Sequence, residues 1–128
     1  MPQVTVLLSH PIVFVMDFDN QDAEIPAYVE ESTASATASC ISVRAIVDVD
    51  GEATISLTTT QEVTDTHHFR EVFRGSIATP NKRVAVVTSE NEKLLEIEVS
   101  WVRSTIAVWV DDEAHPSRIV AQIIPRTT

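Results

Sequence analysis

The sequence is poor in the residue types that most cofactor-binding and catalytic motifs require. Its 128 residues include one cysteine and two glycines, Gly51 and Gly75. One cysteine cannot form an internal disulfide, and two separated glycines cannot build a glycine-rich phosphate loop or a dinucleotide-binding turn. The sequence also lacks the G-x-S-x-G pattern of serine hydrolases. We therefore expect no cofactor and predict that the protein is not an enzyme.

Long hydrophobic runs are absent as well. No stretch approaches the ~18 apolar residues that a membrane-spanning helix needs. The first eight residues contain no basic residue, and Ser9, His10 and Pro11 interrupt the apolar run, so a signal peptide is not expected. Cys40 lies in an apolar segment and is most simply a small core residue. Together these features predict a cytoplasmic protein.

Basic residues are scarce in one half of the chain. The whole sequence has nineteen acidic and nine basic residues, a formal net charge of −10. Residues 1–65 hold eleven of the acidic residues and one basic residue, Arg44, whereas residues 66–128 hold eight of each sign. This charge repels phosphates, so nucleic acid and anionic membranes are not expected as partners. Two explanations stay open: a surface that maintains solubility, or a negative face that fits a basic protein.

Apolar and polar residues alternate with period two along most of the chain, which is typical of strands with one buried face. The length fits one domain spanning residues 1–128. The pattern predicts an all-β fold, an antiparallel β-sandwich of about eight to nine short strands. The predicted strands are residues 4–8, 12–16, 41–47, 53–58, 69–78, 83–88, 93–101, 105–110 and 118–124.

Two connections between these predicted strands are informative. Asp50 and Gly51 lie between the strands at 41–47 and 53–58 and predict a hairpin turn. A long acidic loop follows the second strand, from residue 17 to about residue 37, and loops of that length are often functional. The segment from residue 24 to residue 39, which is low in complexity at 32–39, could form a loop, a short helix or an edge strand. We favour a loop that leads into the strand containing Cys40.

Candidate metal ligands are present without a recognised metal-binding pattern. Asp17, Asp19 and Asp22 alternate as in a calcium loop, but Asp22 stands where an EF-hand has glycine and Tyr28 where it has glutamate. We therefore assign no metal ligand. A looser calcium site stays a separate hypothesis, shared with Asp48 and Asp50 or with Asp111 and Asp112. No zinc spacing joins the four histidines, which we expect on the surface or in turns: His10, His67, His68 and His115.

The two tryptophans differ in their phase along the predicted strands. Trp101 continues the apolar face that includes Leu95, so it is predicted in the core. Trp109 is out of phase with Ile106 and Val108, so we expect it to face away from the core. It is either an exposed binding anchor or a residue packed under a loop or on the second sheet.

Four stretches resemble one protein family. They are SHPIVFVMD at 9–17, CISV at 40–43 with GEATISL at 51–57, FRGSIATPNKRVAV at 73–86, and TIAVWV at 105–110. In these stretches the chain resembles the competence protein J family, small bacterial proteins whose founding type inhibits a DNA-entry nuclease. The resemblance implies an all-β binding protein without a cofactor.

The charge distribution and the resemblance lead to one hypothesis. The protein is a small acidic binding protein, an inhibitor or immunity protein of a basic nuclease or toxin, whose carboxylates stand in for nucleic acid. The candidate partner-binding residues are Asp17, Asp19, Asp22, Glu24, Glu30, Glu31 and Trp109. The alternative is a structural module whose sheet edges or outer face pair with copies of itself to form homo-oligomers. The uncharged apolar runs at 84–87 and 106–110 motivate it, because flat apolar edges recruit other chains.

Overall fold

Ten strands are present in the part of the chain that the computed structural model describes, residues 3–27, 32–59 and 68–125. No helix among these residues is long and apolar enough to cross a membrane. The strands are β1 (Gln3–Val6), β2 (Ile12–Met16), β3 (Ala34–Ala36), β4 (Cys40–Arg44), β5 (Ala53–Thr58), β6 (Arg70–Ala78), β7 (Arg83–Thr88), β8 (Lys93–Glu98), β9 (Arg103–Val110) and β10 (Arg118–Ile124).

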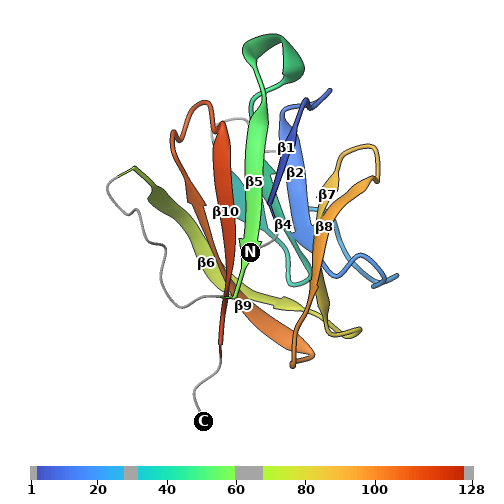
Figure 1. The fold of residues 1–128 in the computed structure, drawn as a ribbon. Helices are drawn as coiled ribbons and strands as arrows, with labels where there is room; N and C mark the ends of the chain where they lie inside the picture. The colour runs from blue at the N-terminus through green and yellow to red at the C-terminus, as the bar shows by residue number, and fades with distance from the viewer. Residues whose placement is uncertain (1–2, 28–31, 60–67, 126–128) are drawn as a thin grey trace.

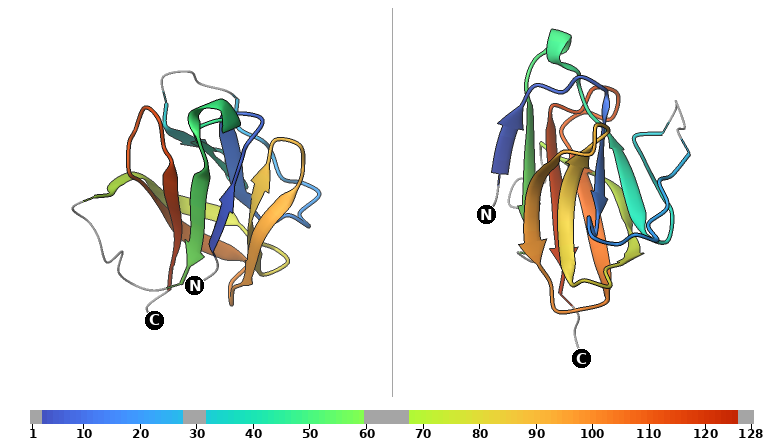
Figure 2. Two further views of the ribbon diagram at one scale, coloured as in Figure 1. Left: turned by 45° about the horizontal axis from the view of Figure 1, so that its top comes forward. Right: turned by 90° about the vertical axis from the view of Figure 1, so that its right-hand side faces the viewer.

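The strands form two five-stranded sheets packed face to face (Figure 1). The first sheet has the order β1-β5-β10-β9-β6, and the second has the order β3-β4-β2-β7-β8. Neighbouring strands are antiparallel except β5 and β10, which run parallel. The view along the edges shows the two layers (Figure 2). The predicted all-β sandwich is confirmed.

Alternating side chains of both sheets meet in one apolar core, as the period-two pattern requires. In β2, Val13 and Val15 are buried in this core, whereas Phe14 between them points to the other face and is half-buried. Full burial of one aliphatic side chain contributes roughly 1.5–3 kcal/mol. The largest fully buried side chains include Ile41, Ile55, Leu57, Ile77, Ile106, Ile119 and Ile123.

The outer face of the second sheet carries a smaller apolar cluster. Met16, Cys40, Ala85 and Val87 form its buried part, and Phe18 packs against them from the segment that follows β2. The Lys93 ammonium lies 5.5 Å from the centre of the Phe18 ring, which adds a cation–π contact. The start of the predicted acidic loop therefore folds back onto the sheet.

The predicted hairpin at Asp50 and Gly51 is wrong. β4 pairs with β2 and β3 in the second sheet, whereas β5 pairs with β1 and β10 in the first. Residues Asp48–Asp50 form a 3₁₀ turn, η1, and Gly51 follows with φ of 130°, a conformation that side-chain-bearing residues rarely adopt. The local turn chemistry is therefore present, but the connection passes from one sheet to the other.

The expectation of a loop throughout residues 24–39 is also wrong, because part of this segment is a strand. Ala34–Ala36 form the short edge strand β3, which pairs with β4. Two further contacts stabilise this pairing: the hydroxyls of Ser35 and Ser42 are 2.9 Å apart, and the Arg44 N–H donates to the Thr33 carbonyl at 2.8 Å. Small polar side chains are tolerated here because the strand lies at the edge of the sheet.

The two apolar runs proposed as self-association edges lie inside the sheets. Residues 84–87 belong to β7, between β2 and β8, and residues 106–110 belong to β9, between β10 and β6. Among the described strands, the longest edge is β6, which carries Arg70, Glu71 and Arg74 and is interrupted by a bulge. Charges and bulges on an edge oppose pairing with another chain. The feature that motivated the homo-oligomer alternative is therefore absent from the described edges.

Removal of a central core side chain tests this packing. Ile55 of β5 is fully buried, so Ile55→Ala should lower the free energy of unfolding by about 2–5 kcal/mol. Ile25 is 53% exposed, and Ile25→Ala should change it by less than about 0.5 kcal/mol. Urea denaturation followed by tryptophan fluorescence measures both variants. Equal losses would contradict the assignment of the core.

Candidate partner-binding surface

Asp17, the first residue after β2, is fully buried. Its Oδ2 accepts a hydrogen bond from the Asn81 backbone N–H at 2.7 Å. Its Oδ1 accepts from the Asp19 N–H at 3.1 Å and from the Asn81 side-chain amide at 3.3 Å. This carboxylate therefore joins the segment after β2 to the turn between β6 and β7. Asp17 was predicted to contact a partner, but its side chain is inside the protein and is not available to one.

The other predicted acidic residues have different surroundings. The Asp19 carboxylate is 3.6 Å from Arg83 Nη1, and both side chains are about half exposed, so part of its charge is compensated within the chain. Asp22 and Glu24 are exposed. The backbone of Glu24 is fixed by two hydrogen bonds, with the Ser39 hydroxyl at 2.7 Å and with the Thr37 hydroxyl at 2.6 Å. Glu30 and Glu31 lie outside the described residues.

The buried position of Asp17 predicts a structural role. Asp17→Ala leaves the N–H of Asn81 without its acceptor, which should cost about 1–3 kcal/mol of unfolding free energy. The matched variant Asp19→Ala removes only an exposed ion pair and should cost less than about 1 kcal/mol. Urea denaturation compares the two. A loss for Asp19→Ala as large as that for Asp17→Ala would contradict this distinction.

A larger group of carboxylates gathers at the end of the sandwich where β2 and β5 begin. Three turns lie at this end: η1 with the residues after it, the turn between β7 and β8 on one side of it, and the turn between β9 and β10 on the other (Figure 2). None of the three turns contains lysine or arginine. We call this surface the acidic end. Its carboxylates are Asp48, Asp50, Glu52, Glu90, Glu92, Asp111, Asp112 and Glu113.

The carboxylates of the acidic end form few ion pairs with described side chains, although His115 and Arg70 act electrostatically on Asp112. Of its eight carboxylates, Glu90 alone forms an ion pair with a described side chain, at 3.9 Å from His10 Nε2. Asp48, Asp50 and Glu52 are exposed, and Val49 between them is 86% exposed. The three turns therefore present charge to the solvent and to any partner.

The turn between β9 and β10 fixes two of these carboxylates by its own backbone. Asp111 Oδ1 accepts hydrogen bonds from the N–H groups of Ser117 and Arg118, each at 3.0 Å. Asp112 Oδ1 accepts from the N–H groups of His115, at 3.0 Å, and Ala114, at 2.8 Å. These two N–H donors lower the pKa of Asp112 below its ordinary value, so it is ionised at neutral pH. The backbone of the turn thus holds the carboxylates of Asp111 and Asp112 in defined positions.

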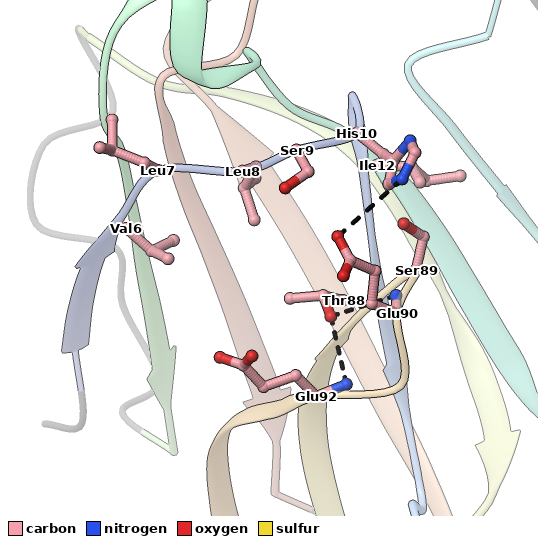
Figure 3. A pocket seen from close by; sticks show the side chains of 10 residues that line it. All are labelled: Val6, Leu7, Leu8, Ser9, His10, Ile12, Thr88, Ser89, Glu90 and Glu92. Atoms are coloured by element: carbon pink, nitrogen blue, oxygen red, sulfur yellow. Dashed lines mark hydrogen bonds and ion pairs between the residues drawn. The ribbon is translucent and has the colours of Figure 1, made fainter.

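A pocket of about 130 Å³ opens at the same end, between the β1–β2 connection and the β7–β8 turn (Figure 3). Val6, Leu8 and Ile12 supply apolar wall, and Glu90 and Glu92 supply carboxylates. The pocket lies beside η1, because the Asp48 N–H donates to the Leu8 carbonyl at 2.8 Å.

Trp109 faces away from the main core, as its phase predicts, on the outer face of the first sheet. It is half-buried, and its indole N–H donates to Gln122 Oε1 at 3.1 Å. The side chain is thus partly covered and its polar atom is already bonded. Trp101 is half-buried and packs against the main core.

The described residues contain no group of three or more histidine, cysteine, aspartate or glutamate side chains arranged to hold a metal ion. The hypothesis of a calcium site shared between residues 17–22 and Asp111 is not supported. Asp17 accepts its hydrogen bonds from Asn81, whereas Asp111 accepts from the backbone of its own turn. His10, His68 and His115 are exposed, and His67 lies outside the described residues. Cys40 is fully buried in the outer cluster of the second sheet.

Burial raises the pKa of the Cys40 thiol to about 12, because the thiolate would lose its hydration. The folded protein should therefore react with iodoacetamide at pH 8 far more slowly than the same chain in 6 M guanidinium, by roughly a hundredfold or more, given the loss of both thiolate and access. Mass spectrometry of the labelled chain measures both rates. Fast labelling of the folded protein would contradict the placement of Cys40.

The sequence missed the acidic end because its members come from three separate turns. The signal was present locally, since each turn is acidic and lacks lysine and arginine. The strand topology that brings the turns to one end is a long-range property, and period-two patterns do not determine it.

Comparison with known proteins adds evidence on the fold. No protein-family model matches the chain, and no curated protein matches it. A solved structure described as crocagin biosynthetic gene J is similar, with a TM-score of 0.56 and 12% sequence identity over 98% of this chain and 96% of that chain. At this identity the similarity shows a shared fold alone, which extends over nearly the whole sandwich.

Proposed function

We propose that this chain is a non-enzymatic binding protein that recognises a basic protein, a nuclease or a toxin, through the acidic end. One observation carries the proposal: three turns without lysine or arginine place eight carboxylates at one end of the sandwich. A partner with a cluster of lysine and arginine side chains is the complement of such a surface.

The proposed mechanism is inhibition by competition with nucleic acid. A nuclease binds phosphates with lysine and arginine side chains, so its active cleft is positively charged. Carboxylates held on well-anchored turns can form charge-assisted hydrogen bonds with the same side chains. Occupation of that cleft by the acidic end excludes the nucleic acid. The resemblance to the competence protein J family, whose founding type inhibits a nuclease, supports this choice of partner.

The acidic end is a better candidate surface than the segment predicted from the sequence. In that segment Asp17 is buried and Asp19 is paired with Arg83, which leaves Asp22 and Glu24 as exposed carboxylates in its described part. Trp109 is half-buried and bonded to Gln122. Within the acidic end, η1 projects furthest in Figure 1, and together with Glu52 just after it exposes three carboxylates near Val49.

Neutralisation of η1 and the adjacent Glu52 tests the proposal. The triple variant Asp48→Asn, Asp50→Asn, Glu52→Gln removes three exposed charges from the acidic end. It should weaken binding to a purified basic nuclease that the unmodified protein binds by roughly tenfold or more, mainly through slower association, and reduce the dependence of Kd on salt. Calorimetry and surface plasmon resonance at two salt concentrations measure both effects.

The matched control removes three exposed charges elsewhere: Asp22→Asn, Glu24→Gln, Glu98→Gln. It has the same net charge as the first variant and should bind almost like the unmodified protein. Duplex DNA should also displace the protein from the nuclease. Equal weakening by the two triple variants would contradict the location of the surface. A stable ternary complex with DNA would contradict the mechanism.

A further inference from the structure

The pocket of Figure 3 lies where the two sheets separate at one side of the sandwich. β1 and β8 are edge strands of opposite sheets on that side. The β1–β2 connection forms one wall of the pocket and the β7–β8 turn forms the other. Its volume, about 130 Å³, is close to that of a cavity of about 150 Å³ that holds one benzene molecule. The pocket is therefore large enough for one side chain of a partner.

The two walls differ in chemistry. Val6 and Leu8 line the side that leads to the main core, where Leu8 is buried and Val6 partly buried. The carboxylates of Glu90 and Glu92 extend from the β7–β8 turn toward the opposite wall, and the Ser9 hydroxyl lies on that wall (Figure 3). These walls suit an occupant with a positively charged head that offers several hydrogen-bond donors and a short apolar stem beside Val6.

The carboxylates extend from a well-anchored turn. The Thr88 hydroxyl oxygen accepts hydrogen bonds from the N–H groups of Glu90, at 3.3 Å, and Glu92, at 3.2 Å. The backbone closes the same turn, with the Thr88 N–H bonded to the Glu92 carbonyl at 2.9 Å and Asn91 at φ of 66°. Because the turn is fixed before binding, little backbone entropy is lost when a ligand enters.

From these features we propose that the pocket receives an arginine side chain of the partner. Its methylene groups would lie along Val6, beside the almost fully buried Leu8, as long basic side chains cover apolar surface, and its guanidinium would bind between Glu90 and Glu92. The planar guanidinium carries five donors, which suits two carboxylates better than a single ammonium does. This inference rests on the proposed function and names the anchor residue of the same surface.

The surroundings of the pocket fit such an anchor. Leu7, on its rim, is 60% exposed, and Val49 of the neighbouring η1 is 86% exposed. Arginine anchors at interfaces are typically enclosed by less critical contacts that exclude water. Leu7 and Val49 offer apolar area for those contacts, and Asp48 and Asp50 flank Val49 in the chain. Entry of the guanidinium replaces the loose pairing of Glu90 with His10.

The experiment is a titration that does not depend on the nuclease. Nuclear magnetic resonance spectra of the labelled protein are recorded with N-acetyl-arginine amide, and separately with the citrulline and lysine analogues. Citrulline has nearly the shape of arginine without its charge. We expect arginine to shift amide signals of residues 7–10 and 88–92 with millimolar affinity. Lysine should bind at least threefold more weakly, and citrulline should produce no saturable shift.

Two variants locate the site. Glu90→Gln with Glu92→Gln should weaken arginine binding at least tenfold, whereas the control Glu98→Gln, at the far end of β8, should leave it unchanged. Ser9→Phe adds a ring at the pocket mouth and should abolish the shifts while all carboxylates stay in place. Both variants alter exposed residues, and their folding is verified by their unfolding transitions.

The inference is overturned if citrulline binds as well as arginine, if lysine binds more tightly, or if Ser9→Phe leaves the arginine shifts intact. These results leave the proposed function standing when the triple variant of η1 still weakens nuclease binding. If arginine binds as expected but the triple variant binds the nuclease normally, the proposed function is contradicted and the arginine site in the pocket is supported.

Discussion

The burial of one apolar face of each sheet against the other determines where every other group in this protein can lie. Inward positions such as Val13, Ile55 and Val108 are occupied by aliphatic side chains. Charges cannot enter this layer without an uncompensated loss of hydration. They are therefore restricted to outer faces, edges and turns. Since the strands are short, the turns at the two ends of the sandwich are a large part of the surface, and they carry most of its charge.

Asp17 is the exception that organises the segment after β2. It is buried with its charge satisfied by Asn81 and by the Asp19 N–H. These hydrogen bonds hold the start of the segment against the β6–β7 turn, and Phe18 and Ala23 cover the outer apolar cluster of the second sheet. An acidic stretch that looks like a solvated loop in the sequence thus contributes a polar anchor and an apolar cover. Asp17 and Asp22 belong to one segment, but Asp17 is buried and Asp22 is exposed, so their roles differ.

The sequence predicted the strands well because each has its own period-two signal, and nine of the ten observed strands overlap a predicted one. It missed β3, whose alanines and serine have no such signal and whose pairing depends on Ser42 and Arg44 of β4. β4 and β5 were predicted to form one hairpin. Asp50 and Gly51 have the same turn chemistry whether the chain returns to its own sheet or crosses to the other. Strand partners are long-range choices that local chemistry leaves open.

The same reasoning explains why the candidate surface in the structure differs from the acidic segment that the sequence predicted. In the sequence, the net negative charge belongs to residues 1–65. In the structure, the acidic end takes η1 from that half and two further turns from the half whose formal charge is balanced. Part of that balance comes from Lys82, Arg83 and Arg103, which lie near the opposite end of the sandwich, where Arg83 pairs with Asp19. A segment that is neutral in total thus places five of its eight acidic residues in two turns of the acidic end, where Arg70 and Arg118 begin the flanking strands β6 and β10. Successive turns of a sandwich tend to lie at alternate ends. The end at which a charged residue lies therefore decides which partner it can contact, and the net charge of its sequence segment does not.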